Sequence, residues 1–74
     1  MLTVEVFKTN VQAADAAQMI VESLNKRCPD SEINFDLEDC DHILRVASDK
    51  INIQLIISVL SELGYCCELL ADTA

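Results

Sequence analysis

The residues best suited to chemistry in this sequence are four cysteines and one histidine. The cysteines are Cys28, Cys40, Cys66 and Cys67, and the histidine is His42. Thiolate and imidazole groups are the ligands that Cu(I) and Zn(II) prefer in proteins. The ligand spacing C-x-x-C does not occur, and adjacent cysteines on a strand point to opposite faces. Free cysteine is also a common buried hydrophobic residue, so a packing role is the competing interpretation.

A second group of chemically active residues is acidic. These residues lie along the predicted second strand and the turn that follows it, and they are Asp30, Glu32, Asp36, Glu38, Asp39 and Asp41. Such a run usually forms a solvated face that protects a sheet edge, and the alternative is a docking surface for a basic partner. The spacing does not follow a calcium-binding EF-hand loop.

Net charge and composition exclude several classes of protein. Thirteen acidic and five basic side chains give a net charge of −8, which repels phosphate backbones and disfavours nucleic-acid binding. No apolar run reaches about 18 residues, so we expect no membrane insertion and a cytoplasmic protein with free thiols. No pair of nucleophile and base can be joined from the sequence, so an enzyme is not predicted. The length of 74 residues allows one domain, residues 1–74.

Two hydrophobic periodicities define the predicted elements. Alternation of Leu2, Val4 and Val6 with polar residues predicts a strand over 2–8, and Phe7 extends its apolar character. Helical spacing predicts a helix over 13–26, which Cys28 ends because it precedes a proline. Alternating apolar residues at 33, 35 and 37, then at 44 and 46, predict a hairpin with a polar turn.

The second half repeats this order. Asn52 is suited to cap a helix over 53–63, Gly64 is suited to end it, and Cys67 with Leu69 marks a short last strand. Two strand-helix-strand units joined by a hairpin predict an α+β, ferredoxin-like βαββαβ sandwich, with two helices on one face of a four-stranded antiparallel sheet. In that arrangement the loop after the first strand, the hairpin at Cys40 and the turn at Gly64 lie at the same end.

The order and motifs resemble the heavy-metal-associated domain family of small copper chaperones. The stretch 10–16 corresponds to the family's metal loop, in which Ala13 and Ala16 occupy the two cysteine positions. Val11 matches the packing methionine, and the Gly64-Tyr65 pair resembles the family's closing motif. The resemblance implies a metal site at the helix start, but alanine offers no ligand, so that site is not carried over to this chain.

Three functions follow as hypotheses. The first is a non-enzymatic interaction module, a degenerate member of that family without a cofactor, which binds a basic protein surface as a monomer or weak homodimer. The second is a Cu or Zn carrier or sensor with a displaced site at Cys40, Cys66, Cys67 and His42. The third is a small-molecule regulatory domain resembling the ACT type, whose sites lie between paired domains. A patch of exposed apolar helix residues would indicate self-association, and the candidates are Met19, Ile53 and Ile57.

Overall fold

The computed structural model describes residues 2–70, and the predicted elements are present in the predicted order. The predicted bounds of the first strand and both helices differ from the observed ones by no more than one residue. Residues 71–74, which the sequence suggests are a frayed tail, lie outside the described residues. The elements are β1 (Thr3–Thr9), α1 (Ala14–Arg27), β2 (Glu32–Asp36), β3 (Ile43–Ser48), α2 (Ile53–Glu62) and β4 (Cys67–Leu69).

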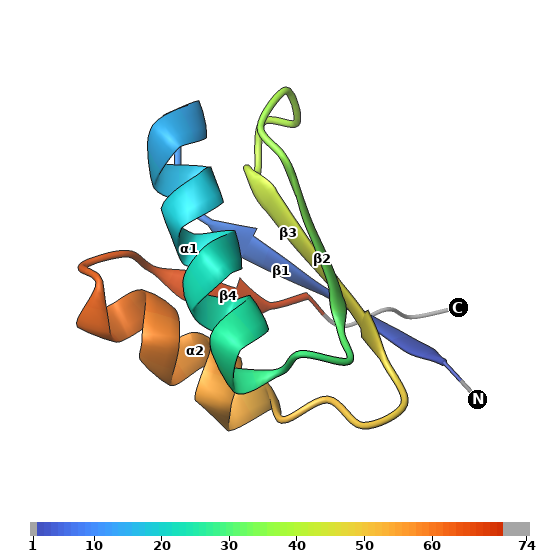
Figure 1. Cartoon of the computed structure of the whole chain (residues 1–74). Coiled ribbons are helices and arrows are strands. Elements are labelled where there is room, and N and C mark those ends of the chain that lie inside the picture. The colour runs from blue at the N-terminus through green and yellow to red at the C-terminus, as the bar shows by residue number, and fades with distance from the viewer. Residues whose placement is uncertain (1, 71–74) are drawn as a thin grey trace.

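The four strands form one antiparallel sheet in the order β2-β3-β1-β4. Both helices lie on the same side of this sheet, as Figure 1 shows, and neither covers its other side, which we call the open face. Each helix connects two strands that are consecutive in the sequence but have a third strand between them in the sheet, which is the split βαβ arrangement. The α+β ferredoxin-like fold predicted from the sequence is therefore confirmed.

The hydrophobic core lies between the helices and the sheet. Helix α1 buries Ala17, Ile20 and Leu24, which share one face because they are three and four residues apart. Helix α2 contributes another such face. The largest fully buried side chains are Phe7, Ile20, Leu24, Leu44, Leu60 and Val11.

Local signals at the helix ends act as predicted. The Asn52 side chain accepts a hydrogen bond from the Leu55 backbone N–H at 3.1 Å, which caps α2. Gly64 follows that helix with a φ of +91°, a conformation that glycine adopts at low cost. Helix α1 ends at Arg27, before Cys28 and the proline that follows it.

The two faces of β1 differ in burial. The alternation of Leu2, Val4 and Val6 indicates a half-buried strand, but its buried face is the other one, because Phe7 is fully buried whereas Leu2 is 62% and Val4 52% exposed. Successive side chains on a strand point to opposite faces, so Phe7 points toward the helices and the Leu2–Val4–Val6 set points to the open face of the sheet.

Within the described residues, no helix is long and apolar enough to cross a bilayer.

Candidate functional site at the hairpin end of the sheet

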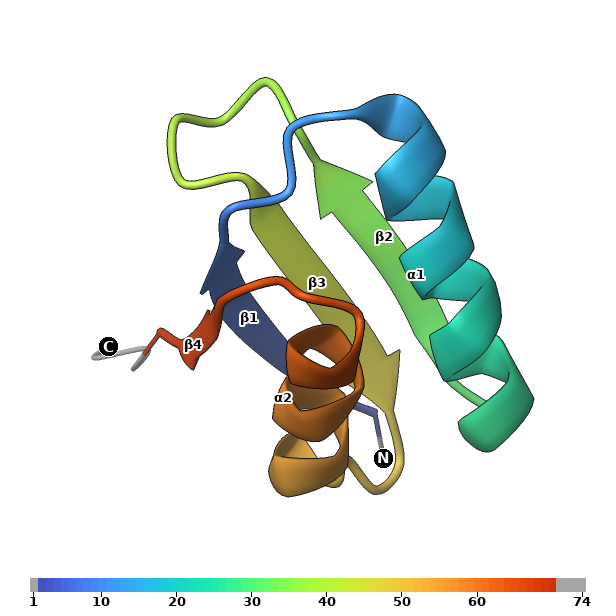
Figure 2. The same ribbon diagram turned by 90° about the vertical axis from the view of Figure 1, so that its left-hand side faces the viewer.

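Three loops meet at the end of the sheet where β1 finishes. These are the loop 10–13 between β1 and α1, the hairpin loop 37–42 between β2 and β3, and the turn 63–66 between α2 and β4. Figure 2 shows the loop after β1 running beside the hairpin loop. The sequence prediction that these segments share one end is thus confirmed. We refer to this region as the hairpin end.

Thr9, the last residue of β1, attaches its strand to the hairpin loop. Its backbone N–H donates to the Asp41 carbonyl at 3.1 Å, and its hydroxyl donates to the His42 carbonyl. The same hydroxyl accepts a hydrogen bond from the Val11 N–H at 3.2 Å. Thr9 is only 6% exposed, so these bonds are shielded from competing water.

Asn10 attaches the same loop to the turn after α2. Its side-chain oxygen accepts a hydrogen bond from the backbone N–H of Cys66, 56 residues away in sequence, at 2.9 Å. Together with the Thr9 bonds, this contact holds the loop 10–13 between the hairpin and the turn. No local sequence pattern marks Thr9 or Asn10 as residues of this site, because their partners are distant in sequence.

The hairpin loop is stabilised by its own hydrogen bonds. The Asp39 side chain accepts from the Asp41 N–H at 2.9 Å, the local turn that aspartate favours. The His42 N–H donates to the Asp39 carbonyl at 3.0 Å, and His42 has a φ of +46° in the left-handed region. Asp39 therefore has a structural role in this loop as well as a charge.

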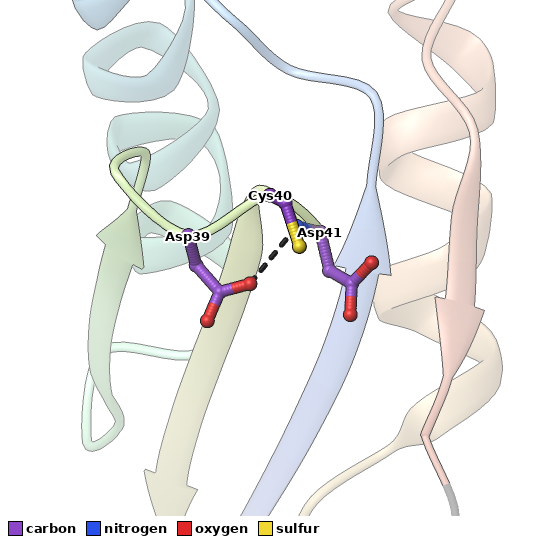
Figure 3. A group of neighbouring side chains, drawn as sticks. All are labelled: Asp39, Cys40 and Asp41. Atoms are coloured by element: carbon purple, nitrogen blue, oxygen red, sulfur yellow. Dashed lines mark hydrogen bonds between the residues drawn. The ribbon is translucent and has the colours of Figure 1, made fainter.

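Asp39, Cys40 and Asp41 place one ligand-type atom each within 4.8 Å of one another, the only such group of three found in residues 2–70. Their side chains point in the same direction from the loop, as Figure 3 shows. The group combines two carboxylates with one thiol, and both carboxylate and thiolate are zinc ligands. Cys40 and Asp39 are exposed to solvent.

The other proposed ligands are not members of this group. Cys66 is exposed, whereas Cys67 and His42 are half-buried. Cys67 packs against the hydrophobic core beside Leu69, as the strand alternation predicted. Burial raises the pKa of the Cys67 thiol from 9.0 to about 11, which lowers its thiolate fraction near neutral pH and makes it a poor metal ligand.

His42 lies in the turn with its ring partly inside the protein. Its carbonyl accepts the Thr9 hydroxyl, and its Nδ1 is buried without a hydrogen-bond partner among the described residues. Only Asp41 separates His42 from Cys40 in sequence. The structure thus gives His42 a backbone role in closing the hairpin end.

Ala13 and Ala16, the positions that the resemblance assigns to metal-binding cysteines, lie at the start of α1. Ala13 is the N-cap residue and is exposed, and Ala16 is half-buried against the core. Neither side chain has an atom that can bind a metal, and Ala13 makes no side-chain cap. The donor set of loop 10–13 therefore does not fit a soft ion. Val11 is fully buried, consistent with the packing role inferred for it.

Carboxylates dominate the electrostatics of the hairpin end. Glu38 and Asp39 are exposed, the Asp41 side chain is 43% exposed, and Asp15 lies in the first turn of α1, which follows the loop 10–13. The Lys8 ammonium lies 3.9 Å from the Asp41 carboxylate, and an exposed pair at this distance is weak. The hairpin end is thus an acidic surface whose loops are held in place by hydrogen bonds from Thr9 and Asn10.

Comparisons with models of known families, with curated proteins and with solved structures give no match to this chain. The fold and the site define this protein as a ferredoxin-like α+β domain with an acidic hairpin end.

Proposed function

We propose that this chain is a non-enzymatic interaction module that binds a basic protein surface through its hairpin end. The observation that carries the proposal is the set of carboxylates of Glu38, Asp39 and Asp41 on a loop that Thr9 holds in place. The scaffold resembles the heavy-metal-associated family, and the alanines at 13 and 16 leave its usual loop without metal ligands. A protein-docking role needs the scaffold and not those ligands.

Charge complementarity is the physical basis of the proposed docking. The chain has a net charge of −8, so its field attracts a basic protein before contact and raises the association rate. Each exposed ion pair contributes only about 0.2–1 kcal/mol, so no single carboxylate can account for binding. Several carboxylates on one fixed loop add their contributions without the entropy cost of ordering a flexible segment.

Calorimetric titration with a short oligolysine peptide at low salt tests this proposal. The variant Glu38→Gln/Asp39→Asn/Asp41→Asn removes three charges and keeps an acceptor oxygen at position 39 for the Asp41 N–H. Three lost pairs at about 0.3–0.5 kcal/mol each predict a roughly five- to tenfold weaker affinity. Binding should also weaken as salt is added.

The matched control removes the same number of charges elsewhere. Glu22→Gln/Asp30→Asn/Asp49→Asn changes exposed carboxylates away from the hairpin end. We expect this control to change the affinity by no more than about twofold. Equal loss in both triple variants would show that the peptide responds only to net charge, and the proposed docking site would be wrong.

A second candidate function is the binding of Zn(II) or Cu(I), and the Asp39–Cys40–Asp41 group favours it. Titration of the reduced protein with each metal tests this candidate, with Cys40→Ser and Cys66→Ser as a matched pair. Metal binding that Cys40→Ser removes and Cys66→Ser preserves would support a site on the hairpin loop. Tight one-to-one binding by the unaltered chain would contradict the proposal of a module without a metal.

A further inference from the structure

The open face of the sheet has an apolar strip along β1. Leu2 is 62% and Val4 52% exposed, and both belong to the set that points away from the helices. On one side of β1, Ala47 of β3 is the register partner of Val4. On the other side of β1, the backbone N–H of Leu70 donates to the Val6 carbonyl. Strand β1 is central in the sheet, so this strip is not an edge.

Charges of both signs surround this strip. By strand alternation and register, the open face carries two cations and three anions, namely Lys8, Arg45, Glu32, Asp36 and Glu68. The Asp41 carboxylate, 3.9 Å from the Lys8 ammonium, adds a fourth anion at the margin of this face. The whole chain has only five cations against thirteen anions. The open face thus holds two of the five cations of the chain, and its mixed charges suit a partner with the same mixture.

We propose that the open face binds a second copy of this chain. In the proposed dimer, the two-fold axis lies between the two open faces and runs perpendicular to the strands, at the level between Val4 and Val6. Each strand then stacks antiparallel on the same strand of the second copy, and Val4 lies on Val6 of that copy. The same axis places Arg45 over Ala47 of the second copy, one strand spacing of about 4.8 Å from that copy's Glu32. The arrangement is isologous, so each contact occurs twice.

This arrangement also separates the acidic loops. Val4 and Thr9 are five residues apart on β1, about 17 Å at the usual rise per residue, and Thr9 contacts the hairpin loop. The antiparallel stacking puts the two hairpin ends on opposite sides of the axis, each about 13 Å from it, because Thr9 is four residues beyond the level of the axis at Glu5. Their separation exceeds the Debye length of about 8–10 Å at moderate salt, so repulsion between two chains of charge −8 is largely screened.

The size of the face predicts a weak dimer. Four strands about 4.8 Å apart, each presenting about five residues at about 3.3 Å per residue, cover roughly 300 Å². A standard stable interface buries about 800 Å² per partner. We therefore expect a dissociation constant of about 0.1–1 mM for the dimer. The proposal of a dimer does not depend on the docking function proposed above.

Sedimentation of the full chain from about 10 μM to about 1 mM tests the proposal. The change Val4→Glu places a charge in the centre of the interface and should weaken dimerisation at least tenfold, since a buried unpaired charge is costly. Met19→Glu is the matched control, because Met19 is 45% exposed on α1, away from the open face, and should leave the dimer unchanged. Circular dichroism verifies folding, and Leu2→Glu replaces Val4→Glu if the latter unfolds.

A charge exchange tests the geometry itself. Arg45→Glu should weaken the dimer, and adding Glu32→Arg should restore it, because the two charges then attract again across the interface. A chain that stays monomeric at about 1 mM overturns the proposal, as does a dimer that tolerates Val4→Glu. Loss of the dimer in Met19→Glu alone, or failure of Glu32→Arg to restore it, equally overturns this arrangement.

Discussion

The two ends of the sheet differ in the loops that connect its strands and helices. At the hairpin end, Thr9 and Asn10 fasten three loops to one another, and carboxylates face solvent. The opposite end opens into a cavity of about 450 Å³ whose lining includes Arg27, Lys50 and Cys28. Sequence-distant hydrogen bonds therefore fix the shape of the acidic end, and a surface of fixed shape is the better docking site.

The largest expected difference between the ends concerns two buried hydroxyl residues. Thr9 and Ser48 lie at opposite ends and are each 6% exposed. Thr9→Val leaves the His42 carbonyl and the Val11 N–H without their partner, so we expect a loss of about 1–3 kcal/mol in the free energy of unfolding. Ser48→Ala should cost less than about 1 kcal/mol. Urea unfolding measures both, and equal losses would remove the distinction between the ends.

A smaller difference is expected for two asparagines. Asn10→Ala should cost about 0.5–1.5 kcal/mol through its bond to Cys66, and Asn52→Ala about 1 kcal/mol through the cap of α2. Amide hydrogen exchange separates the two effects. The Cys66 amide should exchange faster only in Asn10→Ala, and the Leu55 amide only in Asn52→Ala. Faster exchange of both amides in either variant would mean that these contacts are not local.

The smallest expected effect is a change of stability with alkaline pH. Burial raises the pKa of Cys67 from 9.0 to about 11, so the unfolded chain loses this proton before the folded one. The contribution is intact below about pH 9, and stability should fall as pH rises from about 9 to about 11. Cys67→Val should reduce this fall relative to the unaltered chain, while the exposed Cys66→Ser should not. An identical pH profile for Cys67→Val would contradict the burial of this thiol.

The sequence predicts the fold well because its signals are local. Alternation in the strands, the cap at Asn52 and the stop at Gly64 each depend on neighbouring residues, and the structure confirms all three. The alternation does not show which face of β1 is buried, since the exposed residues Leu2 and Val4 give the same pattern as a buried apolar set. Only the packing of Phe7 under the helices determines which set is inside.

The candidate site was predictable only in part. The topology brings the three loops to one end, and the acidic run of the hairpin is evident in the sequence. The bonds from Thr9 and Asn10 join residues 33 and 56 positions apart, so no local pattern reveals them. Met19 is exposed as the sequence indicated, but Ile53 and Ile57 pack against the core, and the larger apolar surface is on the sheet.

The most direct test of the account is to map peptide binding on the chain residue by residue. Amide chemical shifts recorded during titration with oligolysine, at a protein concentration of about 50 μM to limit self-association, report which end responds. We predict that the largest changes fall on residues 37–42 and on Thr9 and Asn10, which contact the hairpin loop or its neighbouring turn. Changes concentrated on residues 28–31 and 48–51 at the opposite end, or spread evenly over the chain, would contradict the central claim.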